Sequence, residues 1–175
     1  GGNSWTDLSE WNLMYYGGGD RYIHADIHQI VFKPNNLNTI AVTSDGGVFY
    51  SNNSHLPGYE PSFIERNQGY NTLQFYTCDI SSDAEDLEVV GGLQDNGTLY
   101  LQLNDNISTG LDINDMITGG DGAFCFFDDN ESILLTSTYY NAWYFIDMET
   151  NEYNYANGSS GVFINPADYD SENNI

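Results

Sequence analysis

The chain has very few positively charged residues, and this shortage excludes several classes of partner. Only three of its 175 residues are Lys or Arg, against 26 Asp or Glu, which gives a formal net charge of −23 at pH 7. Binding to nucleic-acid phosphates or to an anionic membrane surface depends on clustered cations, so we expect neither partner. The longest apolar runs are far shorter than the roughly 18 to 20 residues that cross a bilayer, so no membrane span is expected.

Cysteine is also scarce, which excludes two kinds of covalent scaffold. Cys78 and Cys125 lie 47 residues apart and form no Cys-x-x-Cys pair. Two such residues give neither a disulfide framework nor a zinc site. We expect two buried free thiols that pack as small apolar side chains.

Aromatic residues and glycine are plentiful, and they occur in a repeated pattern. The segments Ser44 to Tyr50 and Gln94 to Tyr100 each place an Asp-x-Gly turn between an apolar run and an aromatic strand, with Asp45 and Asp95 50 residues apart. Such a turn is typical of a β-hairpin. No stretch shows a sustained helical period, and strand repeats of roughly 20 to 50 residues indicate propellers or solenoids. The sequence therefore predicts an all-β fold.

The repeat divides the chain into sheets of four antiparallel strands, the blades of a partial β-propeller with about three to four blades. We predict blades at about 24–67, 74–118 and 121–155, with strands near 28–33, 39–44, 48–51, 62–66, 74–80, 87–92, 98–103, 115–118, 123–127, 132–137, 142–147 and 152–155. Partial blades are expected at both ends, from an outer strand around Trp5 to Trp11 and a new blade starting at Val162. Residues 1–175 are then a fragment of one propeller domain whose partner is the remainder of its own polypeptide.

Several of these motifs resemble the sialidase-like, Asp-box (BNR-repeat) propellers of secreted bacterial proteins. The resemblance is carried by the opening Gly-x-Ser-Trp, by the residues around the two turns, and by the segments 24–34, 67–76, 91–98 and 119–122. It implies a β-propeller and a secreted or cell-surface location. The superfamily includes xyloglucanase-like and sortilin-like propellers, so the resemblance implies no single activity. Sialidases bind the sugar carboxylate with three arginines. This chain has only Arg21 and Arg66, so sialidase activity is not expected.

Strand order brings a set of polar residues to one face of the predicted propeller. Loops before the first strand of a blade and turns between its second and third strands share a face, because neighbouring strands are antiparallel. The residues expected there are His24, Asp26, Asp45, Gln94, Asp95, Asn96 and Asp121. Their oxygens suit a sugar or a hard cation such as calcium, and no other cofactor is expected. Alternatively, the turn aspartates close their own turns by hydrogen bonds to the backbone.

Two further groups of residues admit two interpretations each. His24, Asp26 and His28 alternate along an extended segment and could ligate a metal, or a His-Asp hydrogen bond could fix the loop. The aromatic residues Tyr139, Tyr140, Trp143 and Tyr144 could form a sugar platform, or they could alternate between core and surface.

Two functions remain. The first is a non-catalytic binding or structural propeller module of a larger secreted or cell-surface protein, with a polysaccharide or cell-surface ligand or a cation. The second is a glycoside hydrolase segment with Asp26 and Asp121 as its catalytic carboxyl pair.

Overall fold

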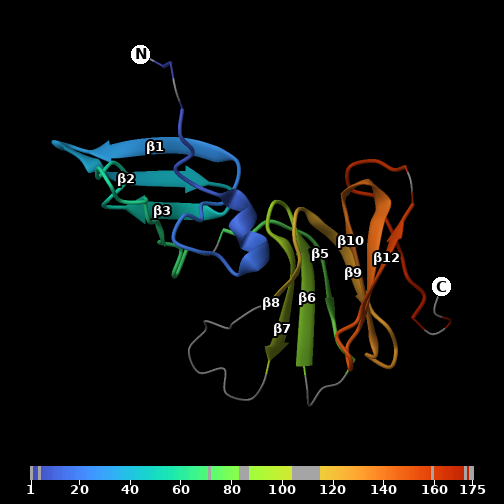
Figure 1. The fold of residues 1–175 in the computed structure, drawn as a ribbon. Coiled ribbons are helices and arrows are strands. Elements are labelled where there is room, and N and C mark those ends of the chain that lie inside the picture. Colours follow the sequence, from blue (N-terminus) through green and yellow to red (C-terminus); the bar gives the residue numbers. More distant parts are fainter. Residues whose placement is uncertain are drawn as a thin grey trace. The chain divides into compact units, whose positions relative to one another are not determined.

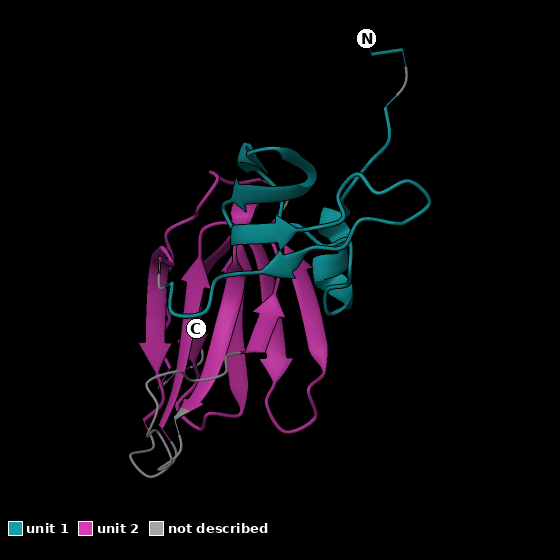
Figure 2. Ribbon diagram, turned by 90° about the vertical axis from the view of Figure 1, so that its left-hand side faces the viewer, with its two compact units in different colours: residues 1–71 teal, residues 72–175 magenta. Residues whose placement is uncertain are grey.

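Strands make up the regular structure of the described chain, apart from two short 3-10 helices, η1 (Trp11–Tyr16) and η2 (Tyr139–Asn141). The computed structural model describes residues 2–3, 5–70, 72–82, 87–103, 115–158, 160–171 and 173. The chain divides into two compact units, residues 1–71 and 72–175, coloured separately in Figure 2. The all-β prediction is confirmed.

The first unit contains one antiparallel sheet in the order β1-β2-β3-β4. Its strands are β1 (Ile27–Lys33), β2 (Asn36–Ser44), β3 (Gly47–Ser51) and β4 (Ile64–Glu65). Alternate residues of β2 and β3 point inward, as the two-residue period of a strand requires. They bury a small core together with residues outside the sheet: Ile23, Ile40, Val42, Phe49 and Phe63.

The second unit contains two sheets of the same kind, β5-β6-β7-β8 and β9-β10-β11-β12, each with neighbouring strands paired in sequence order (Figure 1). The first is formed by β5 (Phe75–Ile80), β6 (Leu87–Leu93), β7 (Gly97–Leu103) and β8 (Asp115–Thr118). The second is formed by β9 (Gly122–Phe127), β10 (Ile133–Thr138), β11 (Ala142–Asp147) and β12 (Tyr153–Asn157). The second strand begins three residues before its predicted start, at Asn36, and the other described strands begin and end within two residues of the predicted positions.

The two sheets of the second unit share a core and are joined by polar contacts. The core contains Val90, Cys125, Phe127, Leu134 and Ile146. The hydroxyls of Thr98 on β7 and Thr136 on β10 lie 2.8 Å apart, and both side chains are completely buried. The Thr77 hydroxyl also donates to the Ala123 carbonyl at 2.7 Å. One hydroxyl–hydroxyl bond and one hydroxyl–carbonyl bond therefore link the two sheets.

The repeated hairpins differ in length but share one backbone requirement. Ser44 pairs with Gly47 across a two-residue turn, whereas Leu93 pairs with Gly97 across a three-residue turn. Gly47 and Gly97 both have positive φ, +106° and +69°. A Cβ on Gly97 would lie 1.9 Å from a backbone carbonyl oxygen. Glycine is required at both positions because L side chains rarely adopt this conformation and no space is left for one.

The ends of the chain differ from the prediction of partial blades. Around Trp5 to Trp11 the described residues form no strand, and the segment continues into η1, which stops at Gly17 in a left-handed conformation. Residues from Val162 onward also form no strand where they are described. A strand pairs its backbone groups with a neighbouring strand, whereas the described residues of these segments lie in no sheet and make single backbone bonds, such as Glu10 N–H to the Arg21 carbonyl and Tyr140 N–H to the Phe163 carbonyl.

One of the two thiol predictions is wrong. Both cysteines are free, and Cys125 is buried as expected, but Cys78 is exposed. Both residues lie on first strands of their sheets, β5 and β9. Only the β9 residue joins the shared core, so equivalent strand positions in the two sheets differ in burial.

Candidate functional site

The β2–β3 turn of the first unit is held by the side chain of Asn67. Its Oδ1 accepts the Val48 N–H at 2.7 Å, and its Nδ2 donates to the Gly46 carbonyl at 2.7 Å. The same Nδ2 donates to a Glu65 carboxylate oxygen. A Cβ on Gly47 would lie 2.1 Å from Asn67 Oδ1. The turn that presents Asp45 is therefore fixed by a side chain from beyond β4.

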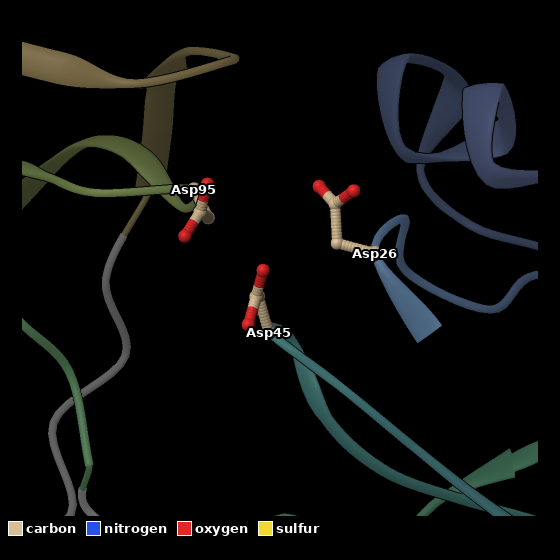
Figure 3. A group of neighbouring side chains, drawn as sticks. All are labelled: Asp26, Asp45 and Asp95. Carbon is tan, nitrogen blue, oxygen red and sulfur yellow. The ribbon is translucent and has the colours of Figure 1, made fainter. Parts of the chain in front are cut away.

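Asp26 and Asp45 come together in the first unit, as predicted. A carboxylate oxygen of each lies within 4.8 Å of the other, with Asp26 on the loop before β1 and Asp45 on the turn after β2 (Figure 3). Asp26 has a positive φ of 57°, a conformation that aspartate adopts more readily than most residues. The Asp45 carboxylate also contacts His28 Nε2 at 2.5 Å.

The predicted metal triad of His24, Asp26 and His28 is not brought together within the described chain. His24 is 6 % exposed, and its Nδ1 lies 3.1 Å from the Ala25 carbonyl oxygen. A Cβ on Gly46 would lie 2.3 Å from the His24 ring, so the imidazole packs directly on the turn. His28 points instead to Asp45. The interpretation in which a His-Asp hydrogen bond fixes the loop fits this geometry, with Asp45 rather than Asp26 as the carboxylate.

In the second unit, a hydrogen bond joins the β6–β7 turn to the loop before β9. The Asp95 N–H donates to the Asp121 carboxylate at 3.0 Å. Asp95, also labelled in Figure 3, has a positive φ of 62°. Asn96 Nδ2 donates to the Gln94 carbonyl, and the Tyr76 hydroxyl donates to Gln94 Oε1 at 3.0 Å. We call this group the polar rim: Tyr76, Gln94, Asp95, Asn96 and Asp121.

The polar rim is partly exposed and strongly acidic. All five of its residues are half-buried. Desolvation raises the pKa of the Tyr76 hydroxyl, and the negative charges of Asp121 and Asp95 raise it further. The three Lys and Arg residues of the chain all precede residue 72, whereas nineteen of its 26 acidic residues follow residue 71. The second unit therefore has no side-chain cation with which to hold an anionic ligand.

These groups can accept hydrogen bonds from several hydroxyls at once. Carboxylate oxygens act only as acceptors when ionised, and the side-chain amides of Gln94 and Asn96 supply both acceptors and donors. A ring of planar polar groups on rigid hairpins is a common way of orienting a polar, uncharged ligand. Sequence motifs predicted four of these residues but not Tyr76, whose position one residue into β5 beside Gln94 depends on strand register.

The predicted aromatic group separates into two parts. Trp143 stacks on Phe126 at 6.5 Å between ring centroids, and Tyr144 packs against the shared core. Tyr139 and Tyr140 instead form the β10–β11 turn, where they contact Phe163. Phe163 was missed as a member of this group because only the folded chain brings it to the turn.

The proposed catalytic carboxyl groups belong to different units. Asp26 precedes β1 in the first unit and Asp121 precedes β9 in the second. Within its own unit, Asp26 lies near Asp45 and Asp121 accepts the Asp95 N–H.

A pocket of about 320 Å³ in the second unit lies away from the polar rim. It is lined by side chains of β9, β10 and β11 and by three residues near the C-terminal end: Phe126, Leu135, Trp143, Phe145, Ala167, Asp168 and Tyr169. Its walls are mainly the outer face of a sheet. Trp143, from the predicted aromatic group, lines this pocket, and no residue of the polar rim does.

Comparison with known proteins gives no family. No protein-family model matches the chain, and no curated protein matches it. Among the described residues, no helix has both the length and the apolar character needed to cross a bilayer.

Proposed function

We propose that this chain is part of an extracellular β-propeller that binds a neutral glycan at the polar rim of its second unit. The propeller proposal is supported by three four-stranded antiparallel sheets with the same sequential strand order. It is also supported by hairpin turns that recur at corresponding places, with Asp45 in one sheet and Asp95 in the next. Repetition of one small sheet is the organisation of a propeller. The remaining blades would come from the rest of the polypeptide.

The observation that supports ligand binding best is the contact between Asp95 and Asp121. The Asp95 N–H lies 3.0 Å from the Asp121 carboxylate, which joins the β6–β7 turn of one sheet to the loop before β9, the first strand of the next. Both carboxylates are half-buried beside Gln94 and the Tyr76 hydroxyl. The negative charges of Asp121 and Asp95 both act on the Tyr76 hydroxyl, and sugar hydroxyls that donate to these carboxylates reduce the cost of gathering like charges there. An anionic ligand would increase it.

Isothermal titration calorimetry of the intact propeller that contains residues 1–175, with cellohexaose and mannohexaose, tests this proposal. We expect binding of at least one neutral hexaose and none of hexagalacturonate, the anionic counterpart. Asp121→Asn keeps an oxygen acceptor for the Asp95 N–H but removes the charge. A hydrogen bond to a charged group contributes about 1.5 to 3 kcal/mol and one to a neutral group about 0.5 to 1.5 kcal/mol, so this variant should lose about 1 to 1.5 kcal/mol and bind about five- to tenfold more weakly.

Asp129→Asn provides the matched control. Asp129 is an exposed acidic residue on the β9–β10 turn, at the opposite end of β10 from the rim. Its substitution removes the same charge from the same unit and should leave the affinity unchanged. Equal effects of the two substitutions, or no binding of either neutral hexaose, would refute the proposal.

Two other outcomes would change the assignment. Release of reducing ends from cellohexaose, abolished by both Asp26→Asn and Asp121→Asn, would favour the glycoside hydrolase. Calcium binding that depends on Asp95 and Asp121, without binding of sugar, would make the rim a cation site.

A further inference from the structure

Three aromatic rings form a compact, exposed cluster on the second unit. The rings of Tyr139 and Phe163 are parallel within 3°, with centroids 6.0 Å apart. The Tyr140 ring stands at 74° to Tyr139 and at 76° to Phe163. Tyr139 is 41 % exposed, Tyr140 is 56 % exposed and Phe163 is 44 % exposed. We call these three residues the aromatic platform.

The platform is held in place by its backbone. Tyr140 and Asn141 have positive φ values of 58° and 62°. This conformation is uncommon for a bulky residue, and it persists only where the surroundings impose it. The Tyr140 N–H donates to the Phe163 carbonyl at 3.0 Å, which ties the C-terminal segment to the turn. The rings are thus fixed before any ligand arrives.

A second set of contacts fixes the segment that carries Phe163. The Asn165 side chain accepts the Val162 N–H and donates to the Val162 carbonyl, closing a short turn around Phe163. Asn141 accepts the indole N–H of Trp143 at 2.9 Å, and its carbonyl accepts the Gly158 N–H at 3.0 Å. These bonds hold the β10–β11 turn and the segment around Phe163 in place, and they leave the three rings partly exposed.

The platform is continuous with the polar rim. A Cβ on Gly120 would lie 3.0 Å from the Tyr139 ring, so this ring rests on the backbone directly before Asp121. The Gly120 carbonyl accepts the Gly97 N–H at 2.7 Å, which links it to the turn that carries Asp95. Tyr140 also occupies the place in the β10–β11 turn that Asp95 occupies in the β6–β7 turn, and their φ values agree, 58° and 62°.

We propose that the aromatic platform is a sugar-stacking subsite, in which a pyranose ring lies on an exposed aromatic face while its hydroxyls reach the polar rim. This inference rests on the proposed function and assigns residues to it. The face of an aromatic ring is electron-rich, and it attracts the C–H groups of one side of a pyranose ring. The neighbouring carboxylates accept its hydroxyls. Half-exposed, pre-ordered rings lose little conformational freedom on binding, which favours affinity.

Two substitutions remove the rings without breaking the backbone. Tyr140→Gly removes one ring and suits the positive φ, so the turn should be retained. Phe163→Leu keeps an apolar side chain but removes the aromatic face. Each should weaken binding of the neutral hexaose by about three- to tenfold in the same calorimetric titration. Tyr153→Leu removes a tyrosine of β12 that is 50 % exposed, and it should leave the affinity unchanged.

The results separate the two proposals. If Asp121→Asn weakens binding but Tyr140→Gly and Phe163→Leu do not, the rim binds the sugar and the platform proposal is wrong. If the wild-type chain binds neither cellohexaose nor mannohexaose, both proposals are wrong. Thermal denaturation of each variant, with an unfolding midpoint close to that of the wild-type chain, excludes a loss of folding as the cause of weaker binding.

Discussion

The hydroxyl pair between the two sheets of the second unit allows a quantitative test of their packing. Thr98 and Thr136 are completely buried, and their hydroxyls bond to each other at 2.8 Å. Replacing either residue with valine keeps the shape but leaves the other hydroxyl without this partner. A buried unsatisfied hydroxyl costs about 1 to 3 kcal/mol, so each single substitution should lower the free energy of unfolding by about that amount.

The double substitution Thr98→Val with Thr136→Val removes both hydroxyls together. Replacement of both partners by apolar groups of the same shape is nearly neutral, so the double variant should recover most of the stability of the wild-type chain. Urea denaturation, followed by circular dichroism, measures the four free energies of the cycle. Additive losses in the double variant would show that the hydroxyls do not bond across the sheets, and would refute the packing described above.

Three further predictions follow from single contacts. Gly47→Ala should destabilise the chain by about 2 kcal/mol or more in thermal denaturation, and by less in an Asn67→Ala background, because the Cβ meets the Asn67 side chain; an equal loss in both backgrounds would exclude the steric cause. Iodoacetamide should label Cys78 in the folded chain and spare Cys125, as mass spectrometry of the peptides would show, whereas labelling of both residues at equal rates would contradict their difference in burial. Burial raises the pKa of the Cys125 thiol to about 11 from 9.0, so this thiol contributes stability that is complete below pH 9 and is lost as pH rises towards 11. Between pH 8 and pH 10.5 the free energy of unfolding should fall by about 2 kcal/mol more for the wild-type chain than for Cys125→Ala, and equal slopes would contradict the assignment.

Much of the fold was predictable because the local signals were strong. Hairpins with Asp-x-Gly turns and alternating apolar residues specify both the strands and their pairing, and Asp45 and Asp95 occupy the predicted turns. The N-terminal segment could not be predicted in the same way. Trp5 to Trp11 has strand-like composition, yet a strand exists only where a neighbour satisfies its backbone. The exposure of Cys78 could not be predicted from the pattern either, because burial of a residue on β5 depends on what packs against that strand.

The candidate site was predictable only in part, for a related reason. Strand order places Gln94, Asp95 and Asp121 at one end of the second unit without any knowledge of side-chain contacts. Tyr76 and Phe163 join the site through register and through the path of the C-terminal segment. Neither of these follows from a sequence motif. The turn that holds Tyr140 in the left-handed conformation likewise contains no glycine that would have indicated it in the sequence.

We propose above that one end of the second unit binds a neutral glycan. Chemical-shift perturbation in ¹⁵N–¹H spectra during titration with the neutral hexaose that binds tests it most directly, because it reports on each backbone amide. We expect the largest changes on the polar rim and the aromatic platform, at residues 74–76, 94–96, 119–121, 139–141 and 163. Changes centred on the β9–β10 turn at residues 128–132, the other end of the same sheet, would contradict it.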